Sequence, residues 1–450
     1  MNKIYFLFSY EARSKSMSLF LLGFLGIILL LIFLLLFGMP VGFAMALVGF
    51  LGFGAVMGFN ASMGMVSSTV WSVFSNYGLI IIPLFIFMGQ IAFHTGVSEK
   101  MYTAADRFIG HIRGGMAMAT VFACSAFSAI CGSNSATAAT MTAVALPEMN
   151  KYGYNSKLST GVIACGSTLG VVIPPSVVLI IIGLYTNQSI VKLFYGGIGA
   201  GLLLTLMFAF TVFFICLKHP TWGPAGTRFS WKERGKALLD SSEILIIFII
   251  VMLGLYFGFF TPVEAGAVGA FLVLAITFFQ GKLNVKKLMA ATVDTLIVSA
   301  MVMMIVAGAA ILGKFLTVTR LPFEVASWVA TLPVPKIFIL VLILLVYAIG
   351  GMLMDALALL LITLPIFFPM AQVLGFNPIW FGITVTVVTT MGAVTPPIAA
   401  TAYVVAGMAK PVPLVDVFRG VFYFLPAYLI TIFLLLLFPK IVLFLPNLLQ

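Results

Sequence analysis

Runs of about 20 predominantly apolar residues recur along the whole chain of 450 residues. A run of this length can cross the hydrocarbon core of a bilayer as an α-helix, because a helix satisfies its backbone polar groups without water. The composition agrees, since 62% of the residues are hydrophobic and only 8% are charged. Soluble domains are about 45–50% apolar and about 25% charged. The sequence therefore predicts an all-α polytopic membrane protein.

The net charge of +11 lies in the short segments between apolar runs, which indicates membrane topology and contact with membrane lipid rather than nucleic-acid binding. Segments near 96–115, 149–157, 218–241, 280–290 and 409–419 carry 15 of the 23 Lys and Arg residues. By the positive-inside rule these segments face the cytoplasm, which places both termini outside. The four cysteines show no metal-ligand spacing, so we interpret them as packing residues.

A polar interruption, Gly132-Ser133-Asn134-Ser135-Ala136-Thr137, divides the apolar region 116–149 into two pieces that are short for a membrane span. Hydroxyl and amide groups are costly in hydrocarbon unless they are satisfied. We interpret 116–149 as a re-entrant hairpin with its tip at residues 133–135. The next apolar region, 158–186, contains Gly170 and Pro174-Pro175, which predict a broken helix.

The second half repeats this plan when the sequence is shifted by 222 residues. The shift pairs Pro40 with Pro262, Pro147 with Pro369, Gly170 with Gly392, and Pro174-Pro175 with Pro396-Pro397. It places Ser133 on Asp355, within a second hairpin at 337–370, and it predicts a second broken helix at 379–408. Internal repeats of this kind are typical of transporters.

Each half then holds about five spans and one hairpin, and an odd number of spans inverts the second half. The predicted divisions are an N-terminal tail at 1–17, a first inverted repeat at 18–217, a cytoplasmic connecting loop at 218–241 and a second inverted repeat at 242–450.

The two proline-interrupted stretches could supply cation ligands. Proline removes a donor and frees carbonyl groups one turn back, and freed carbonyls with Ser, Thr or Asn oxygens can bind a sodium ion. The exposed N-terminal ends of half-helices can face an anion. The alternative is a pair of ordinary proline kinks whose Ser and Thr residues bond back to the helix.

Three other polar features can be explained by structure alone or by contact with water. Asp355 is ionisable within an apolar region, which suggests function, although a carboxylate at a hairpin mouth could simply reach water. Glu264 follows Thr261-Pro262 and is interpreted as a helix cap. His94 and His111 have no partner at ligand spacing and are interpreted as interfacial residues. No P-loop, nucleophile elbow or HExxH motif occurs in the sequence, so we expect neither an enzyme nor direct use of ATP.

Taken together, residues 132–137, Ile173-Pro174-Pro175-Ser176, Phe260-Thr261-Pro262-Val263-Glu264-Ala265 and Val394-Thr395-Pro396-Pro397 resemble the large membrane subunit of TRAP transporters, the DctM-like family. The resemblance runs from about Met17 to the C-terminus. It implies an ATP-independent, sodium-coupled importer in a bacterial inner membrane. It also implies a small four-helix membrane subunit and a periplasmic substrate-binding protein as partners. The implied substrate is an organic anion such as a C4-dicarboxylate, sialic acid or another sugar acid. The implied mechanism is an elevator, in which a transport domain slides against a scaffold.

The resemblance also implies site residues. A first sodium site would use Ser133, Asn134 and the Gly170–Pro174 stretch. A second would use Gly350, Gly351, Asp355 and the stretch Gly392–Pro396, including Thr395. The substrate would lie near Ser135, Thr137, Ser176 and Thr395. The main alternative is a stand-alone sodium-coupled anion transporter of a related elevator fold without a binding protein. A membrane anchor and a membrane enzyme are further alternatives. The two polar breaks argue against an anchor, and the absence of catalytic motifs argues against an enzyme.

Overall fold

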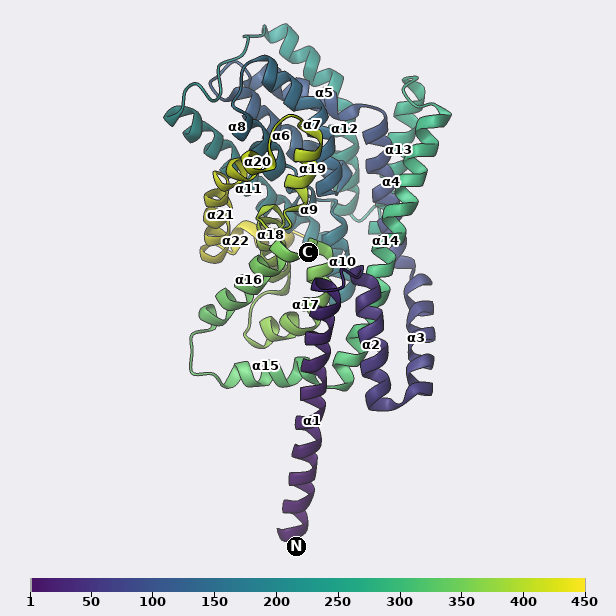
Figure 1. Cartoon of the computed structure of the whole chain (residues 1–450). Helices are drawn as coiled ribbons and strands as arrows, with labels where there is room; N and C mark the ends of the chain where they lie inside the picture. The colour runs from purple at the N-terminus through teal and green to yellow at the C-terminus, as the bar shows by residue number, and fades with distance from the viewer. Residues whose placement is uncertain (1, 450) are drawn as a thin grey trace. The chain divides into compact units, whose positions relative to one another are not determined.

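A computed structural model describes residues 2–449, with side chains from Leu19 onward except those of Val97, Ser98 and Ile244. The predicted tail at 1–17 falls outside the described side chains and stays a prediction. The described residues form α-helices, one short 3-10 helix and no strand (Figure 1). The helices are α1 (Asn2–Leu35), α2 (Val41–Met57), α3 (Phe59–Phe74), η1 (Tyr77–Ile80), α4 (Ile81–His94), α5 (Val97–Ile109), α6 (Gly115–Cys131), α7 (Asn134–Lys151), α8 (Ser156–Gly166), α9 (Leu169–Val172), α10 (Val177–Thr186), α11 (Ile190–Lys218), α12 (Trp231–Tyr256), α13 (Pro262–Phe279), α14 (Val285–Val318), α15 (Leu321–Thr331), α16 (Lys336–Leu353), α17 (Ala356–Val373), α18 (Pro378–Val394), α19 (Ala400–Met408), α20 (Leu414–Phe422), α21 (Leu425–Leu437) and α22 (Lys440–Asn447).

The predicted all-α membrane fold is confirmed. Among the described residues, 8 helical segments are long and apolar enough to cross a membrane, or up to 9 if the bent α12 counts as one span. Four shorter apolar helices of 10–17 residues accompany them, and α6 is one of these. A helix needs about 20 residues to span the hydrocarbon core, so α6 alone is short for a crossing.

The chain forms two compact units, and each unit takes residues from both halves of the sequence. Unit 1 contains residues 1–79, 298–343 and 357–378. Unit 2 contains residues 80–297, 344–356 and 379–450. The sequence halves and the compact units are therefore different divisions of the same chain.

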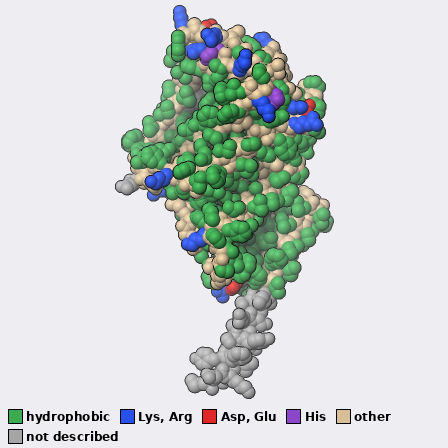
Figure 2. All heavy atoms as spheres, turned by 90° about the vertical axis from the view of Figure 1, so that its left-hand side faces the viewer, with side chains coloured by type: hydrophobic (Ala, Val, Ile, Leu, Met, Phe, Trp, Pro, Cys, Tyr) green, Lys and Arg blue, Asp and Glu red, His purple; other side chains and the backbone are tan. Residues whose placement is uncertain are grey.

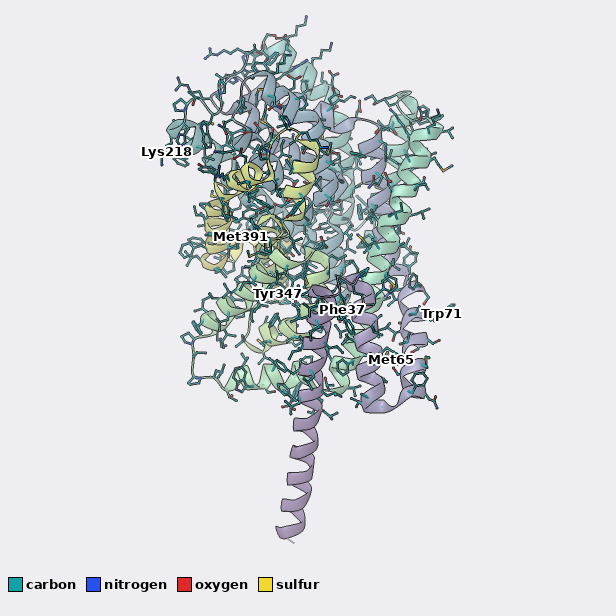
Figure 3. The ribbon with its side chains drawn as sticks, viewed as in Figure 1. Phe37, Met65, Trp71, Lys218, Tyr347 and Met391 are labelled. Atoms are coloured by element: carbon teal, nitrogen blue, oxygen red, sulfur yellow. The ribbon has the colours of Figure 1, made fainter. Side chains whose placement is uncertain are left out.

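Unit 1 is held together by close helix contacts at small residues. A Cβ atom at Gly49 of α2 would lie 2.7 Å from the backbone nitrogen of Leu312 in α14, so the two backbones touch there. The ring of Phe315 is 1% exposed and packs against Gly26 of α1 and Gly52 of α2. On α3, Met65 is buried whereas Trp71 is 75% exposed and points outward (Figure 3). Small residues that let helices approach closely are typical of packing inside membranes, where no hydrophobic effect drives association.

Unit 2 is organised around α11, which contacts α6, α8, α9, α10, α21 and α22. Glycines on α11 let the neighbouring helices approach closely. A Cβ atom at Gly197 would lie 2.7 Å from the Val172 carbonyl oxygen, and one at Gly201 would meet the side chain of Ile173. Helix α11 therefore lies directly against the first predicted helix break.

The predicted connecting loop at 218–241 is shorter than expected, because α12 already begins at Trp231. The Ser230 side chain accepts a hydrogen bond from the Glu233 N–H, and the Glu233 carboxylate accepts one from the Ser230 N–H at 2.7 Å. This capping box satisfies N-terminal donors that a helix otherwise leaves open, so the helix starts within the polar segment. Thr261 and Glu264 form the same box at the start of α13, which confirms the capping interpretation of Glu264.

Candidate functional site

The first predicted hairpin tip is an interruption of two residues between α6 and α7. Gly132 ends α6 with φ of +59°, and a Cβ atom there would lie 2.9 Å from the Pro175 carbonyl oxygen. Both the left-handed backbone and the close approach require glycine. Ser133 caps α7 by accepting from the Ala136 N–H, and the Thr137 hydroxyl donates to the Ser133 carbonyl at 2.8 Å. The sequence therefore placed this interruption correctly.

The first broken helix packs against this tip. Helix α9 ends at Val172 and α10 begins at Val177, with a cis peptide bond between Pro174 and Pro175. The Ser176 hydroxyl donates to the Val171 carbonyl at 2.6 Å and accepts from the Leu179 N–H at 3.4 Å. A Cβ atom at Gly170 would lie 3.2 Å from the Ser133 carbonyl oxygen. The backbone of α9 therefore lies in contact with the hairpin tip.

Asn134 carries an unused acceptor at this contact. Its Oδ1 atom is buried and has no hydrogen-bond partner, whereas a buried polar atom is nearly always paired. A sodium ion bound by carbonyl and amide oxygens would satisfy it. The Gly170 carbonyl, to which Pro174 cannot donate, belongs to the residue that contacts the same tip. Within the described residues no group of three His, Cys, Asp or Glu side chains could hold a metal ion, so a transition-metal site is not what this donor set offers. The residues present fit a sodium ion held by neutral oxygens.

The second hairpin has a different tip. Helix α16 ends at Leu353 and α17 begins at Ala356, so Asp355 lies at the junction and is exposed. The predicted tip residues Gly350 and Gly351 are instead inside α16. Gly351 meets Gly392 of α18 there, since a Cβ atom on Gly351 would lie 3.1 Å from the Cα atom of Gly392 and 2.7 Å from the Thr389 carbonyl oxygen. Gly351 thus serves a close helix crossing rather than a chain reversal.

The second break resembles the first and also adjoins its hairpin. Helix α18 ends at Val394 and α19 begins at Ala400, with a cis peptide bond between Pro396 and Pro397. The Ile398 N–H donates to the Met352 carbonyl of α16 at 3.2 Å. The Thr395 hydroxyl donates to the carbonyl of Met391, which Figure 3 labels on α18. Each break therefore touches the hairpin that precedes it in the sequence.

One helix connects the two halves at this place. Both α9, from the first break, and α19, from the second, pack against α7 (Figure 1). Helix α19 also packs against α8. Elements that lie more than 200 residues apart in the sequence are thus assembled within unit 2.

The four residues predicted to line a substrate differ in what their hydroxyl groups can do. Ser135 is exposed at the start of α7. The hydroxyls of Thr137, Ser176 and Thr395 each donate to a backbone carbonyl, at 2.8, 2.6 and 2.7 Å. They keep lone pairs for accepting but have no hydrogen left to donate. Ser135 is therefore the one of the four whose donor is not used by a hydrogen bond to the protein.

The predicted site residues leave out other polar groups of unit 2. Buried hydroxyls without a partner are found on Ser128 of α6, Thr140 of α7 and Thr401 of α19. Each of them lies beside alanine in the sequence, a pattern that indicates only ordinary small-residue packing. The interpretation of His94 as lacking a partner is also incomplete, because its Nε2 atom lies 2.8 Å from Asp294 Oδ2. The two residues are 200 positions apart, so only the tertiary fold pairs them.

A family model described as the tripartite ATP-independent periplasmic transporter, DctM component, matches residues 28–441. The chain belongs to the DctM family. A C4-dicarboxylate TRAP transporter large permease protein of Vibrio cholerae is 33% identical over 374 residues, which are 78% of this chain and 82% of that protein. A sialic acid TRAP transporter large permease protein of the same species is 29% identical over 417 residues, or 92% of this chain and 96% of that protein. DctM-family membership makes this chain a component of a transporter and confirms the resemblance noted in its motifs.

The structure is also similar to that of the Alcanivorax borkumensis YdaH transporter, with a TM-score of 0.53 and 14% sequence identity. The match covers 86% of this chain and 90% of that one. At this identity the likeness concerns the fold alone. The DctM-family chain thus shares a general architecture with a transporter of very different sequence.

Proposed function

We propose that this chain is the large permease subunit of a sodium-coupled, binding-protein-dependent secondary transporter that imports an organic anion across a bacterial inner membrane. The single observation that carries the proposal is the contact between each hairpin and the helix break that follows it. In the first pair Gly170 lies against Ser133, and in the second Ile398 donates to Met352. Broken helices packed on hairpins are a recurrent way to bind ions and anions within a membrane.

Two sodium sites of unequal character follow from this arrangement. The first would use the carbonyl of Ser133, the free Oδ1 atom of Asn134 and the carbonyls near Gly170 and Pro174. The second would use the Asp355 carboxylate with backbone oxygens near Gly350, Gly392, Thr395 and Pro396. A bound sodium ion would supply positive charge beside an anionic substrate, which would lie near Ser135. The Ser176 hydroxyl bonds both sides of the first break, whereas the Thr395 hydroxyl bonds one turn back to Met391.

Family membership supports the remaining parts of the proposal. A small four-helix subunit would bind the scaffold, a periplasmic binding protein would deliver the substrate, and the transport domain would move as an elevator. Related large permeases are named for C4-dicarboxylates, ectoine and sialic acid. We therefore propose an organic acid as the substrate and no particular compound.

The test is uptake by proteoliposomes that contain this chain, its small subunit and its binding protein. We expect labelled organic acid to accumulate only when sodium is higher outside and when binding protein is added. Equal uptake with potassium in place of sodium would remove sodium coupling from the proposal. Equal uptake without binding protein would instead favour the stand-alone transporter.

A further inference from the structure

An apolar groove lies in unit 2 between helices α5, α6 and α12. Its volume is about 340 Å³, and ligand cavities usually have volumes of about 300–1,000 Å³. Phe108 of α5, Phe122 of α6, and Leu238 and Leu245 of α12 are among the side chains that line it. None of the lining residues is charged. Neither the sodium sites nor the substrate position proposed above uses any of them.

The groove is walled by apolar helix faces and is open on one side. Met101, Ala105 and Phe108 recur at helical spacing, so the apolar face of α5 forms one wall. On α12, Leu238 is 46% exposed and Leu245 is 36% exposed. Both leucines line the groove, so its opening is apolar as well. In a membrane protein an apolar opening of this kind faces lipid chains rather than water.

Basic side chains gather at the end of the groove where α12 begins. Arg234 lies one helical turn before Leu238, so the two residues share one side of α12. The segment 218–241 is predicted to face the cytoplasm, and Lys and Arg side chains gather at the end of unit 2 that carries α5 (Figure 2). No ion pair joins the basic residues around the start of α12 to another described side chain, and these residues are Arg228, Lys232, Arg234 and Lys236.

The acidic residues of α12 do not cancel this charge. Residues 228–236 carry four basic side chains and one acidic side chain, Glu233. The Glu233 carboxylate accepts hydrogen bonds from the N–H and the hydroxyl of Ser230, each at 2.7 Å. Glu243 pairs with a lysine of α5 at 3.1 Å. Asp240 lies two residues after Leu238 and therefore on nearly the opposite side of the helix. The basic end of the groove thus favours an anion.

The start of α12 has the features of a helix at the membrane surface. Trp231 is 78% exposed and Leu239 is 73% exposed, although both lie among charged residues. Exposed tryptophan is typical of the interface between membrane and water. The Arg234 guanidinium lies 4.9 Å from the centre of the Trp231 ring, which keeps this cation at the same level. Helix α12 also bends by 50° between Glu243 and Leu245, so its first part departs from the direction of the span.

We propose that the groove binds an acyl chain of an anionic phospholipid whose phosphate group lies at Arg234. A guanidinium can donate to two phosphate oxygens at once, and basic pockets on the cytoplasmic side of membrane helices suit anionic headgroups. The acyl chain would pack against Phe108, Phe122 and Leu245. The lipid would thereby join α5 and α12 to α6, the helix that leads to the first hairpin tip. A soluble anion is a poorer match, because it would leave the apolar part of the groove empty.

The test adds lipids to the delipidated full-length chain in a neutral detergent and records the thermal unfolding midpoint and native mass spectra. We expect dioleoylphosphatidylglycerol to raise the midpoint saturably and to remain bound in the mass spectra. Dioleoylphosphatidylcholine has the same chains without a net charge and should bind at least fivefold more weakly. Glycerol phosphate has the anionic group without the chains and should not raise the midpoint. Equal binding of the two lipids, an equal rise with glycerol phosphate, or no binding at all would overturn the proposal.

Two variants separate the charge from the space. Arg234→Gln removes the cation and should weaken phosphatidylglycerol binding about fivefold, while phosphatidylcholine binding should not change. Ala105→Phe fills the groove without changing any charge and should weaken phosphatidylglycerol binding at least tenfold.

Each variant has a matched control in unit 1. Arg320→Gln removes an arginine that likewise lies over an aromatic ring, 5.2 Å from the centre of Phe323. Ala61→Phe makes the same enlargement at an exposed position of α3. Both controls should bind phosphatidylglycerol like the unmodified chain, and the proposal fails if either groove variant that elutes normally in gel filtration binds it like its control.

Discussion

The two hairpin and break pairs differ although one sequence pattern underlies both. The first pair is neutral and closed: Ile173 to Ser176 are buried, and the Ser176 hydroxyl makes hydrogen bonds on both sides of the break. The second is charged and more open: Asp355 and Pro397 are exposed, and Ala399, the residue at the N-cap position of α19, gives no side-chain cap.

This difference teaches that a repeated Pro-Pro pattern fixes where a helix breaks but not how the break is stabilised. In the first half a serine side chain and the packing of α11 hold the broken segment. In the second half the glycine crossing of α16 and α18 and one backbone hydrogen bond hold it. We therefore expect the two halves to respond differently to matched substitutions.

The largest effect should come from the register-related pair Asp355 and Ser133. Asp355→Asn should lower sodium-driven uptake about 100-fold, because a hydrogen bond or ligand contact to a charged group is worth about 1.5–3 kcal/mol and each 1.4 kcal/mol is tenfold. Ser133→Ala keeps the backbone carbonyl and should lower uptake only about tenfold or less. Initial rates in proteoliposomes at several sodium concentrations would measure both. Equal losses in the two variants would show that the sites are alike.

The next largest difference is expected between alanine substitutions at two glycines, one in each half of the sequence. Gly392→Ala places a Cβ atom 2.6 Å from the Ala348 carbonyl, which backbone cannot easily avoid, and should lower stability by about 1–3 kcal/mol. Gly170→Ala makes a milder contact of 3.1 Å with Ser133 and should cost less.

Gly407→Ala provides the control for these two changes. No atom lies within 4 Å of a Cβ atom at Gly407, so alanine there should be neutral or slightly stabilising in its helix. Thermal unfolding of the three purified variants in one detergent would rank them. A Gly392→Ala midpoint equal to that of Gly407→Ala would contradict the tight crossing.

A smaller difference in stability is expected when the hydroxyl groups at the two breaks are removed. Ser176→Ala loses both a helix cap and a hydrogen bond to Val171, so its stability should fall by about 1–2 kcal/mol. Thr395→Ala loses only a hydrogen bond within its own helix and should lose less than about 1 kcal/mol. The difference between the two unfolding midpoints is the measurement, and a larger loss at Thr395 would reverse the assignment of the closed and open breaks.

The smallest effect is expected at Ala399, whose φ of +37° is unfavourable for a residue with a side chain. Ala399→Gly should relieve this cost, although glycine loses more backbone freedom on folding, so the net gain should be about 0.5 kcal/mol. A thermal unfolding midpoint that falls on substitution would indicate that the methyl group of Ala399, which is 1% exposed, contributes more by packing than it costs in backbone energy.

Much of the secondary structure was predictable because lipid and water impose strong rules on local sequence. The interruptions near Ser133, Pro174, Asp355 and Pro396 follow from polar residues or prolines in apolar runs, and the structure ends helices at each of them. The placement of Gly350 and Gly351 at the hairpin tip was wrong, because both lie inside α16 and glycine marks both chain reversals and close helix crossings such as the one at Gly351. The contact partner that distinguishes them, Gly392, is 41 residues away.

The sequence by itself determined that the chain is an all-helical membrane protein, where its helices break, and which family it belongs to. These properties depend on hydrophobicity, on proline and glycine geometry and on short motifs, all of which are local. Only the tertiary structure decided that α9 and α19 meet on α7, that Asn134 has an unused oxygen, and that Phe108, Phe122 and Leu238 line one groove. These properties depend on which distant helices pack together. Inside a membrane, helix packing depends on how closely small residues fit, and a hydrophobicity pattern does not report that fit.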